Sequence, residues 1–507
     1  MILPALAALV AAVPQADHAV TSTRDPVSQG IVAVIIASVF VLLALEKAHR
    51  VLIIFGAVAL LWLITYLSPY RLISFEDSQG ALDLNVILLL ASMMAVVGVL
   101  KTTGVFSYAV ARLLRLAGGR PTVVMALLTW ATGLLSSVAD NVTTVIFTTP
   151  MALEVAALTR IRPVALLLPM VMAANIGGTA TLIGDPPNIL IGSGAGLSFL
   201  DFVVNLTAPV LTMLVVLEWY SNRYYRADYA AGIQKIAPEQ IHLPTLTDVP
   251  LLRWGLGISA LIFIGFFTHT VTGMPAAIPA AVGAVALLIV QDVLYLRKRS
   301  ATHEERIHGI LQVIEREIEW PTLSFFALLF IAVAAAVHTG LIDTISGGLA
   351  GLIEAGRTQF GWSPKATLLF AALLILWASG VLSALIDNIP YVAVTIPIVA
   401  SLTGRLTGDT EILWWALSLG ACLGGNGTPI GASANVTVIG LAEKAKEIIG
   451  FGQFVHYGAR VTFITLLISS VFISLHIYWG RGNTHLVAFA MLAVFAVGRT
   501  WLVLRQR

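Results

Sequence analysis

Apolar stretches long enough to cross a lipid bilayer recur along the whole chain. A membrane-spanning helix needs about 20 predominantly apolar residues. Windows that approach or exceed this length lie at residues 31–45, 51–67, 84–100, 199–219, 254–272, 276–296, 320–337, 455–479 and 486–504. The pattern predicts an all-α polytopic membrane protein.

Four further apolar regions are interrupted by polar residues, glycine or proline. Residues 121–158 and 365–402 are too long for one span, and each carries an Asp-Asn pair at its centre. Residues 163–195 and 411–446 each run into a break rich in Gly, Pro and Asn and then resume. Irregular backbone at membrane depth is tolerated only when it is packed in protein or lines a water-filled cavity. We therefore expect two re-entrant helical hairpins and two broken transmembrane helices.

The interrupted regions occur twice at a constant spacing. An offset of 247 residues carries Asp140 onto Asp387 and Asn188 onto Asn435 without a gap. Polar breaks at corresponding positions of two halves are typical of transporters built from internal repeats, whose binding site lies at the repeat interface. The spacing therefore predicts one binding centre built from both halves of the chain.

The repeat divides the chain into two halves. Residues 29–225 form the first half, residues 226–253 a cytoplasmic linker and residues 254–480 the second half. Each half is expected to hold three full spans, a hairpin that does not cross, a broken helix and a final span, so the number of crossings is odd. The second half is therefore predicted to be inverted relative to the first, with the hairpin tips meeting near the bilayer midplane. One extra helix at 483–507 lies outside the repeat.

Composition narrows the class of protein. Of the 507 residues, 58% are hydrophobic and only 11% are charged, which is more apolar surface than a soluble fold of this size can bury. The net charge is +2, and no basic cluster indicates binding to nucleic acid. The single cysteine, Cys422, excludes an intrachain disulfide and a set of thiolates for a soft metal.

Basic residues predict the orientation in the membrane. Most Lys and Arg side chains fall in loops on the side that holds Lys47 and Arg50, and cytoplasmic loops are enriched in these residues. The N-terminal segment 1–28 is therefore expected outside and the C-terminus in the cytoplasm of a multi-pass cell-membrane protein. Residues 1–16 resemble the apolar part of a signal peptide but lack a basic start, which leaves cleavage open.

Polar residues at the interruptions are the candidates for ion or substrate binding. An ionised carboxylate at membrane depth costs at least about 2.5–3.5 kcal/mol, so carboxylates retained there are functional candidates. Amide and hydroxyl side chains at the same places can donate and accept hydrogen bonds. The candidate set is Asp140, Asn141, Thr143, Gly178, Thr181, Asp185, Asn188, Asp387, Asn388, Gly425, Asn426, Thr428 and Asn435.

Structural roles compete with binding at several of these positions. The Asp-Asn pairs fit the N-caps of the returning hairpin helices, where a carboxylate accepts backbone N–H groups. The paired glycines fit close helix packing as well as direct contact between backbone and substrate. No nucleophile–base pair and no metal-ligand set lies in the predicted spans, so we do not expect an enzyme.

The interrupted segments resemble motifs of the ion transporter superfamily. The first half carries these motifs at 136–144 and 175–188, and the second half carries them at 385–390 and 420–435. The resemblance is greatest to the branch of arsenite permeases, the melanosomal P protein and D-type sodium/proton antiporters, especially its P-protein-like members. It extends over residues 29–482.

This resemblance implies a scaffold domain, often dimeric, and a transport domain that moves like an elevator. A homodimer in the lipid bilayer is therefore expected. Dicarboxylate/sodium symporters of the superfamily carry Ser-Asn-Thr at both hairpin tips, whereas this chain has Asp-Asn-Val at 140–142 and Asp-Asn-Ile at 387–389. The added negative charge argues against a dicarboxylate and favours coupling to protons or sodium.

Proton-coupled cation exchange of the sodium/proton antiport type is the favoured hypothesis. Asp140 and Asp387 would alternate between protonated and cation-bound forms, with Na⁺ near these residues, Asn141 and Asn388. No cofactor is expected beyond the transported or coupling ion. Three alternatives remain open, namely an efflux permease for arsenite or another small anion, a sodium-coupled carboxylate symporter and a channel-like ion pathway.

Overall fold

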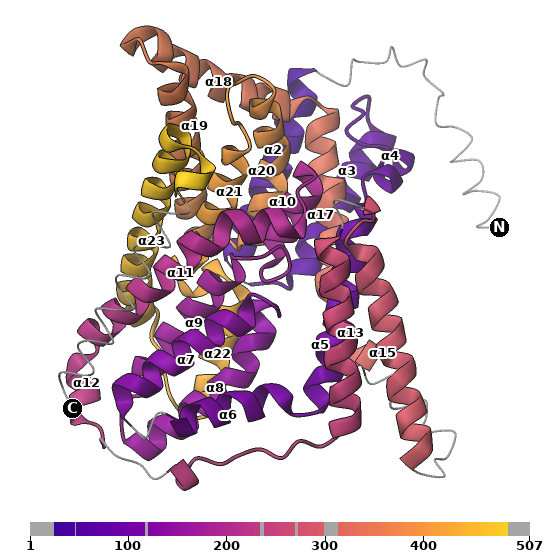
Figure 1. The fold of residues 1–507 in the computed structure, drawn as a ribbon. Coiled ribbons are helices and arrows are strands. Elements are labelled where there is room, and N and C mark those ends of the chain that lie inside the picture. Colours follow the sequence, from indigo (N-terminus) through magenta and orange to yellow (C-terminus); the bar gives the residue numbers. More distant parts are fainter. Residues whose placement is uncertain are drawn as a thin grey trace. The chain divides into compact units, whose positions relative to one another are not determined.

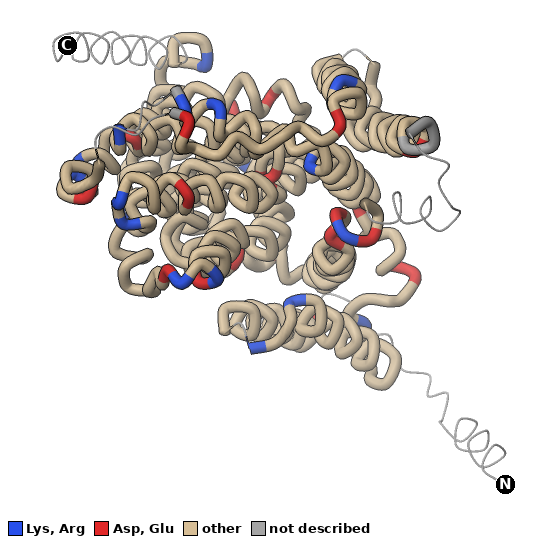
Figure 2. Tube along the Cα trace, turned by 90° about the horizontal axis from the view of Figure 1, so that it is seen from below, with Lys and Arg blue, Asp and Glu red and all other residues tan. Residues whose placement is uncertain are grey.

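The chain is an all-helical polytopic membrane protein. The computed structural model describes residues 25–45, 47–116, 120–233, 238–268, 272–298 and 313–484, and no strand occurs in these ranges. Ten helices in them are long and apolar enough to cross a membrane. Charged residues are sparse along the trace in Figure 2. Residues 1–16, which resemble part of a signal peptide, lie outside the described residues. The expected helix at 483–507 also lies outside them, except for residues 483 and 484.

The chain forms two compact units, each drawing on both halves of the sequence. The smaller unit comprises residues 1–82 and 327–345. It contains α2 (Pro26–Ala44), α3 (Arg50–Leu67), α4 (Phe75–Gly80) and most of α17 (Trp320–His338). Helix α2 packs against α3. The larger unit, residues 83–326 and 346–507, contains every candidate site residue.

The first part of the larger unit contains the first pair of interrupted elements. Its helices are α5 (Leu84–Thr102), α6 (Val105–Leu116), α7 (Pro121–Ser136), α8 (Asn141–Thr159), α9 (Val164–Gly178), α10 (Pro186–Ala195), α11 (Phe199–Tyr224), α12 (Arg226–Ala231), the 3-10 helix η1 (Pro238–Gln240), α13 (Val249–Phe267) and α15 (Ala277–Lys298). A short turn joins α7 to α8, and residues 179–185 separate α9 from α10.

The second part repeats this order of elements. It contains α18 (Leu341–Phe360), whose first residues belong to the smaller unit, α19 (Pro364–Leu385), α20 (Asn388–Thr403), α21 (Ile412–Gly424), the 3-10 helices η2 (Gly425–Gly427) and η3 (Pro429–Gly431), α22 (Ser433–Lys444) and α23 (Phe451–Trp479). A short turn joins α19 to α20, and η2 and η3 occupy the break between α21 and α22.

Helices α9 and α21 lie at the core of the larger unit. Every residue of both helices is buried, which explains why their sequences are apolar on all sides. Helix α9 packs against α7, α8 and α11, and α21 packs against α19, α20 and α23. Helix α10 packs against α20, whereas α22 packs against α8 (Figure 1). The two interrupted regions are therefore interlocked.

Glycines permit the closest of these helix contacts. A Cβ atom on Gly177 would lie 2.0 Å from the carbonyl oxygen of Gly133, and one on Gly424 would lie 2.5 Å from that of Gly380. A Cβ on Gly178 would lie 2.5 Å from Gly184 O. The paired glycines are therefore close-packing positions, which is one of the two roles expected from the sequence.

The hydropathy windows did not predict helices α6 and α18. Both are amphipathic, and charged residues such as Arg115 and Arg357 lower their average hydropathy. Each begins directly after a glycine with positive φ, 76° at Gly104 and 77° at Gly340, a conformation that glycine adopts without strain. The matching Thr-Gly pairs at 103–104 and 339–340 were the available sequence signal.

Candidate functional site

Each hairpin turn ends in an aspartate that caps the returning helix. The Asp140 carboxylate accepts a hydrogen bond from the backbone N–H of Thr143 at 2.8 Å, at the start of α8. The Asp387 carboxylate accepts one from the backbone N–H of Ile389 at 3.1 Å, at the start of α20. Both aspartates are only partly buried. The capping role expected for the Asp-Asn pairs is therefore present in both hairpins.

The helix breaks are tied to the hairpin turns by the same hydrogen bonds in both halves. The Thr181 hydroxyl donates to the Ser137 carbonyl at 2.6 Å, and the Thr428 hydroxyl donates to the Ala384 carbonyl at 2.5 Å. The amide of Asn188 donates to Thr181 O at 2.9 Å. The amide of Asn435 donates to Thr428 O at the same distance. These pairs are related by the 247-residue offset.

We expect Thr181→Val and Thr428→Val to destabilise the protein by similar amounts. Thr181 is buried and Thr428 is partly buried. Each change removes one hydroxyl donor and leaves a carbonyl oxygen without its partner, which costs roughly 1–3 kcal/mol. Thermal unfolding of the purified variants measures the two effects. A large loss in one variant and none in the other would show that only one break depends on this contact.

Asp185 occupies the centre between the two hairpins. Its side chain is 1% exposed and lies in the break between α9 and α10. The amide of Asn141 donates to Oδ1 at 3.3 Å, and the amide of Asn388 donates to Oδ2 at 3.5 Å. No Lys, Arg or His among the described residues forms an ion pair with this carboxylate. One carboxylate therefore joins both hairpin tips.

Asn175 is a central residue that sequence reasoning missed. This fully buried side chain of α9 donates to Asn426 Oδ1 at 2.8 Å and to Asn435 Oδ1 at 3.0 Å. It accepts a hydrogen bond from Asn141 at 3.1 Å. The residue stands within the first-half motif, but its counterpart at the 247-residue offset is Cys422, so the repeat did not single it out.

We expect Asn175→Leu to destabilise the protein strongly. Leucine is of similar size but removes one acceptor and two donors, so the amide groups of Asn141, Asn426 and Asn435 lose partners in a buried site. Each unsatisfied group costs roughly 1–3 kcal/mol. The midpoint of thermal unfolding in detergent measures the loss, and a midpoint equal to that of the wild-type protein would contradict this role.

Amide donors at the centre are largely used within the protein. The two amide hydrogens of Asn175 are taken by Asn426 and Asn435. Those of Asn141 are taken by Asn175 and Asp185. Those of Asn188 and Asn435 go to backbone carbonyls of the two breaks. The available groups are therefore mainly acceptors.

Acceptors remain at both hairpin tips. Within the described part of the chain, the carbonyl oxygens of the Asn141 and Asn388 side chains accept no hydrogen bond, although both residues are buried. They stand beside the Asp185 carboxylate, to which the same side chains donate. The arrangement is rich in oxygen ligands, which suit hard cations.

The predicted site residues fall into three groups. Asn141, Asn388, Asp185, Asn426 and Asn435 belong to the central hydrogen-bonded cluster. Asp140, Asp387, Thr143, Thr181, Thr428 and Asn188 hold the turns and breaks in place. Gly178 and Gly425 pack against Gly184 and Gly431 across the breaks.

The side chains of Ser418 and Cys422 on α21 contact Asn188 of α10. The Ser418 hydroxyl donates to Asn188 Oδ1 at 2.6 Å, and the Cys422 sulfur lies 3.6 Å from the same oxygen. Both are fully buried. They were not predicted as site residues, because neither residue type repeats at the constant offset: Val171 is the counterpart of Ser418, and Asn175 is that of Cys422.

Comparison with known proteins identifies the family. A family model described as "CitMHS: Citrate transporter" matches residues 40–420. An uncharacterized transporter of Mycobacterium bovis is 34% identical over 451 residues, covering 88% of this chain and 97% of the relative. The human P protein is 28% identical over 509 residues, covering 84% of this chain and 57% of the relative.

Solved structures share the fold at low sequence identity. The YdaH transporter of Alcanivorax borkumensis aligns with a TM-score of 0.55 and 17% identity, covering 90% of this chain and 99% of its own. MtrF of Neisseria gonorrhoeae, described as illuminating a class of antimetabolite efflux pumps, aligns with a TM-score of 0.55 and 14% identity over 88% of this chain and 94% of its own. Taken with the family match, these relatives show that the chain is a membrane transporter, not an enzyme, and belongs to the CitMHS family of the ion transporter superfamily.

Proposed function

We propose that this transporter exchanges protons for a monovalent cation such as Na⁺ across the cell membrane. The observation that carries the proposal is the Asp185 carboxylate, buried between the two hairpin tips with hydrogen bonds from both. A charge at this depth costs about 2.5–3.5 kcal/mol on insertion scales. A proton or a cation offsets that cost, and binding of one excludes the other.

The composition of the centre favours a cation over an anion. Amide donors are largely engaged, whereas the carboxylate and the Asn141 and Asn388 carbonyl oxygens are acceptors. Among the residues that the structure describes, no Lys or Arg takes part in the hydrogen bonds of this cluster. An anion would therefore meet negative charge with few donors to stabilise it.

Asp140 and Asp387 are proposed as further carboxylates of the cation pathway. Each precedes the Asn that donates to Asp185, and each is only partly buried. Ions that approach either tip would meet these carboxylates before reaching the buried one. The N-cap hydrogen bonds hold them in fixed positions.

Alternating access of the elevator type is the proposed mechanism. Two observations support two inverted repeats around one centre. The same hydrogen bonds recur in both halves, and each broken helix packs its second segment against the hairpin of the other half, α10 on α20 and α22 on α8. Alternate movement of the two hairpins would expose Asp185 to each side in turn. We further propose a homodimer with the N-terminus outside and the C-terminus in the cytoplasm.

Sodium-coupled carboxylate transport is a second candidate. It is favoured by the description of the matching family model as a citrate transporter. A carboxylate substrate would require positive charge that the amide groups of the centre do not supply, and a cation bound at Asp185 would provide it.

Transport in proteoliposomes tests the proposal. Purified protein is reconstituted with an internal pH dye, and Na⁺, Li⁺, K⁺, citrate, succinate or arsenite is added outside. We expect Na⁺ or Li⁺ to drive proton movement that saturates with concentration. A response to citrate, succinate or arsenite without any response to cations alone would contradict cation exchange. Flux that neither saturates nor shows counterflow would indicate a channel-like pathway.

A further inference from the structure

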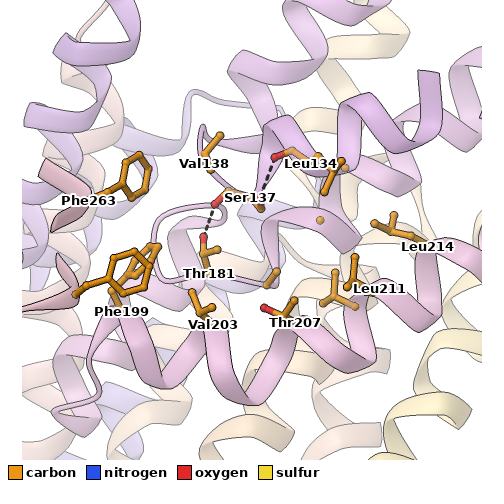
Figure 3. A pocket seen from close by; sticks show the side chains of 15 residues that line it. Leu134, Ser137, Val138, Thr181, Phe199, Val203, Thr207, Leu211, Leu214 and Phe263 are labelled. Carbon is orange, nitrogen blue, oxygen red and sulfur yellow. Dashed lines mark hydrogen bonds between the residues drawn. The ribbon is translucent and has the colours of Figure 1, made fainter. Parts of the chain in front are cut away.

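An apolar cavity lies directly behind the first hairpin turn. Its volume is about 360 Å³, and residues of α7, α9, α11 and α13, of the first hairpin turn and of the break after α9 line it. Figure 3 shows Phe199 and Phe263 on one side, and Val203 and Leu211 of α11 on another. The volume falls within the range of small-molecule binding pockets, about 300–1,000 Å³.

Two of the hydroxyl groups at the cavity wall already donate hydrogen bonds within the protein. The Thr181 hydroxyl donates to Ser137 O at 2.6 Å, and the Ser137 hydroxyl donates to Leu134 O at 2.8 Å (Figure 3). Ordered water requires two to four polar partners, and apolar cavities of this kind stay dry. An apolar occupant would fill the space without breaking a hydrogen bond.

The rim of the cavity is apolar and exposed. Leu134, Val138 and Phe267 are 53%, 43% and 44% exposed, and all three line the cavity. Helices α11 and α13 are both long and apolar enough to cross the membrane. The medium that surrounds such helices is lipid hydrocarbon, not water.

We propose that the cavity binds an acyl chain of a membrane lipid. The medium at the rim is lipid hydrocarbon. The aromatic and branched side chains of the interior make favourable dispersion contacts with an acyl chain, and these contacts are lost if nothing occupies the cavity. The cavity is separate from the hydrophilic centre around Asp185. The proposal of an acyl-chain site therefore does not depend on which species is transported.

The acyl chain would also restrain the hairpin turn. Ser137 and Val138 belong to the turn before the Asp140 cap, and Thr181 belongs to the break that contains Asp185. Val138 and Phe263 also line a second apolar cavity of about 260 Å³ beside α5 and α6. The turn therefore borders a cavity on two sides, and an acyl chain in the larger cavity would limit its movement.

Photolabelling tests the site directly. The protein is reconstituted in vesicles that contain a phospholipid with a diazirine in the middle of one acyl chain, irradiated, and mapped by peptide mass spectrometry. We expect labels on cavity-lining residues of α11 and α13. Val203→Trp fills the cavity and should lose this labelling. Val204→Trp is the matched control, because Val204 is 41% exposed on the same helix and does not line the cavity.

The outcomes separate a lipid site from its alternatives. Thermal unfolding checks that both variants fold. Leu211→Phe provides a milder filling variant at a second lining residue of α11. Labelling at the lining residues that is equal in the filled and control variants would overturn the proposal. Loss of labelling on addition of Na⁺ or citrate would also overturn it, because the cavity would then belong to the substrate pathway.

Discussion

Asp185→Asn is expected to reduce cation/proton exchange strongly while the protein still folds. Asparagine has the shape of aspartate and keeps one acceptor for the two tip amides, but it neither titrates nor carries charge. Removing a buried, hydrogen-bonded charge from a binding site costs about 2–5 kcal/mol. Cation-driven flux in proteoliposomes should therefore fall by roughly 30-fold or more, at tenfold per 1.4 kcal/mol.

Asp140→Asn and Asp387→Asn are the matched comparisons for this variant. Asparagine is as good an N-cap as aspartate, so both changes remove charge while retaining the cap. We expect weaker cation affinity and altered pH dependence with exchange still measurable in each single variant. Full activity of Asp185→Asn, with inactivity of the capping variants, would assign the coupling role to the hairpin tips alone.

Gly177→Ala should destabilise the protein strongly. The added methyl group would lie 2.0 Å from the Gly133 carbonyl oxygen, so α7 and α9 must move apart. Overpacking of a core typically costs 1–3 kcal/mol and here displaces backbone, so we expect about 3 kcal/mol or more. Thermal unfolding and the yield of monodisperse protein measure the effect.

Gly257→Ala serves as the control for this prediction. Gly257 lies within α13, and no atom lies within 4 Å of the position a Cβ would take. Alanine favours helix by about 0.8–1.0 kcal/mol over glycine, so this variant should be as stable as the wild-type protein or more so. Equal stability of the two variants would contradict the close packing of α7 on α9.

The length of the apolar stretches predicted the long helices, because a helix that crosses the hydrocarbon of a bilayer needs about 20 predominantly apolar residues. The polar breaks at 137–140 and 179–185 were equally visible, since helix-breaking and charged residues interrupt otherwise apolar sequence there. The amphipathic helices α6 and α18 were not predicted from apolar stretches. Their polar faces lower the average hydropathy that identifies a span.

The site could be predicted as a set of residues but not as an arrangement. The offset between Asp140 and Asp387 marked the two tips, yet sequence gives no distances, and both carboxylates proved to be helix caps. Asp185 has no acidic counterpart, because Ala432 occupies the matching position. Asp185 accepts hydrogen bonds from both hairpin tips, and Asn175 contacts residues of the second half. Both features became evident only from the packing of α9 and its break against the second half.

Proton release on cation binding tests the central claim most directly. Na⁺ or Li⁺ is added to detergent-solubilised protein in weakly buffered solution, and the pH change is compared between wild type and Asp185→Asn. Because a proton and a cation compete for the Asp185 carboxylate, we expect cation binding to release protons from the wild-type protein. This release should be lost in Asp185→Asn. Equal proton release from both proteins, or cation binding to the wild type without proton release, would contradict the account.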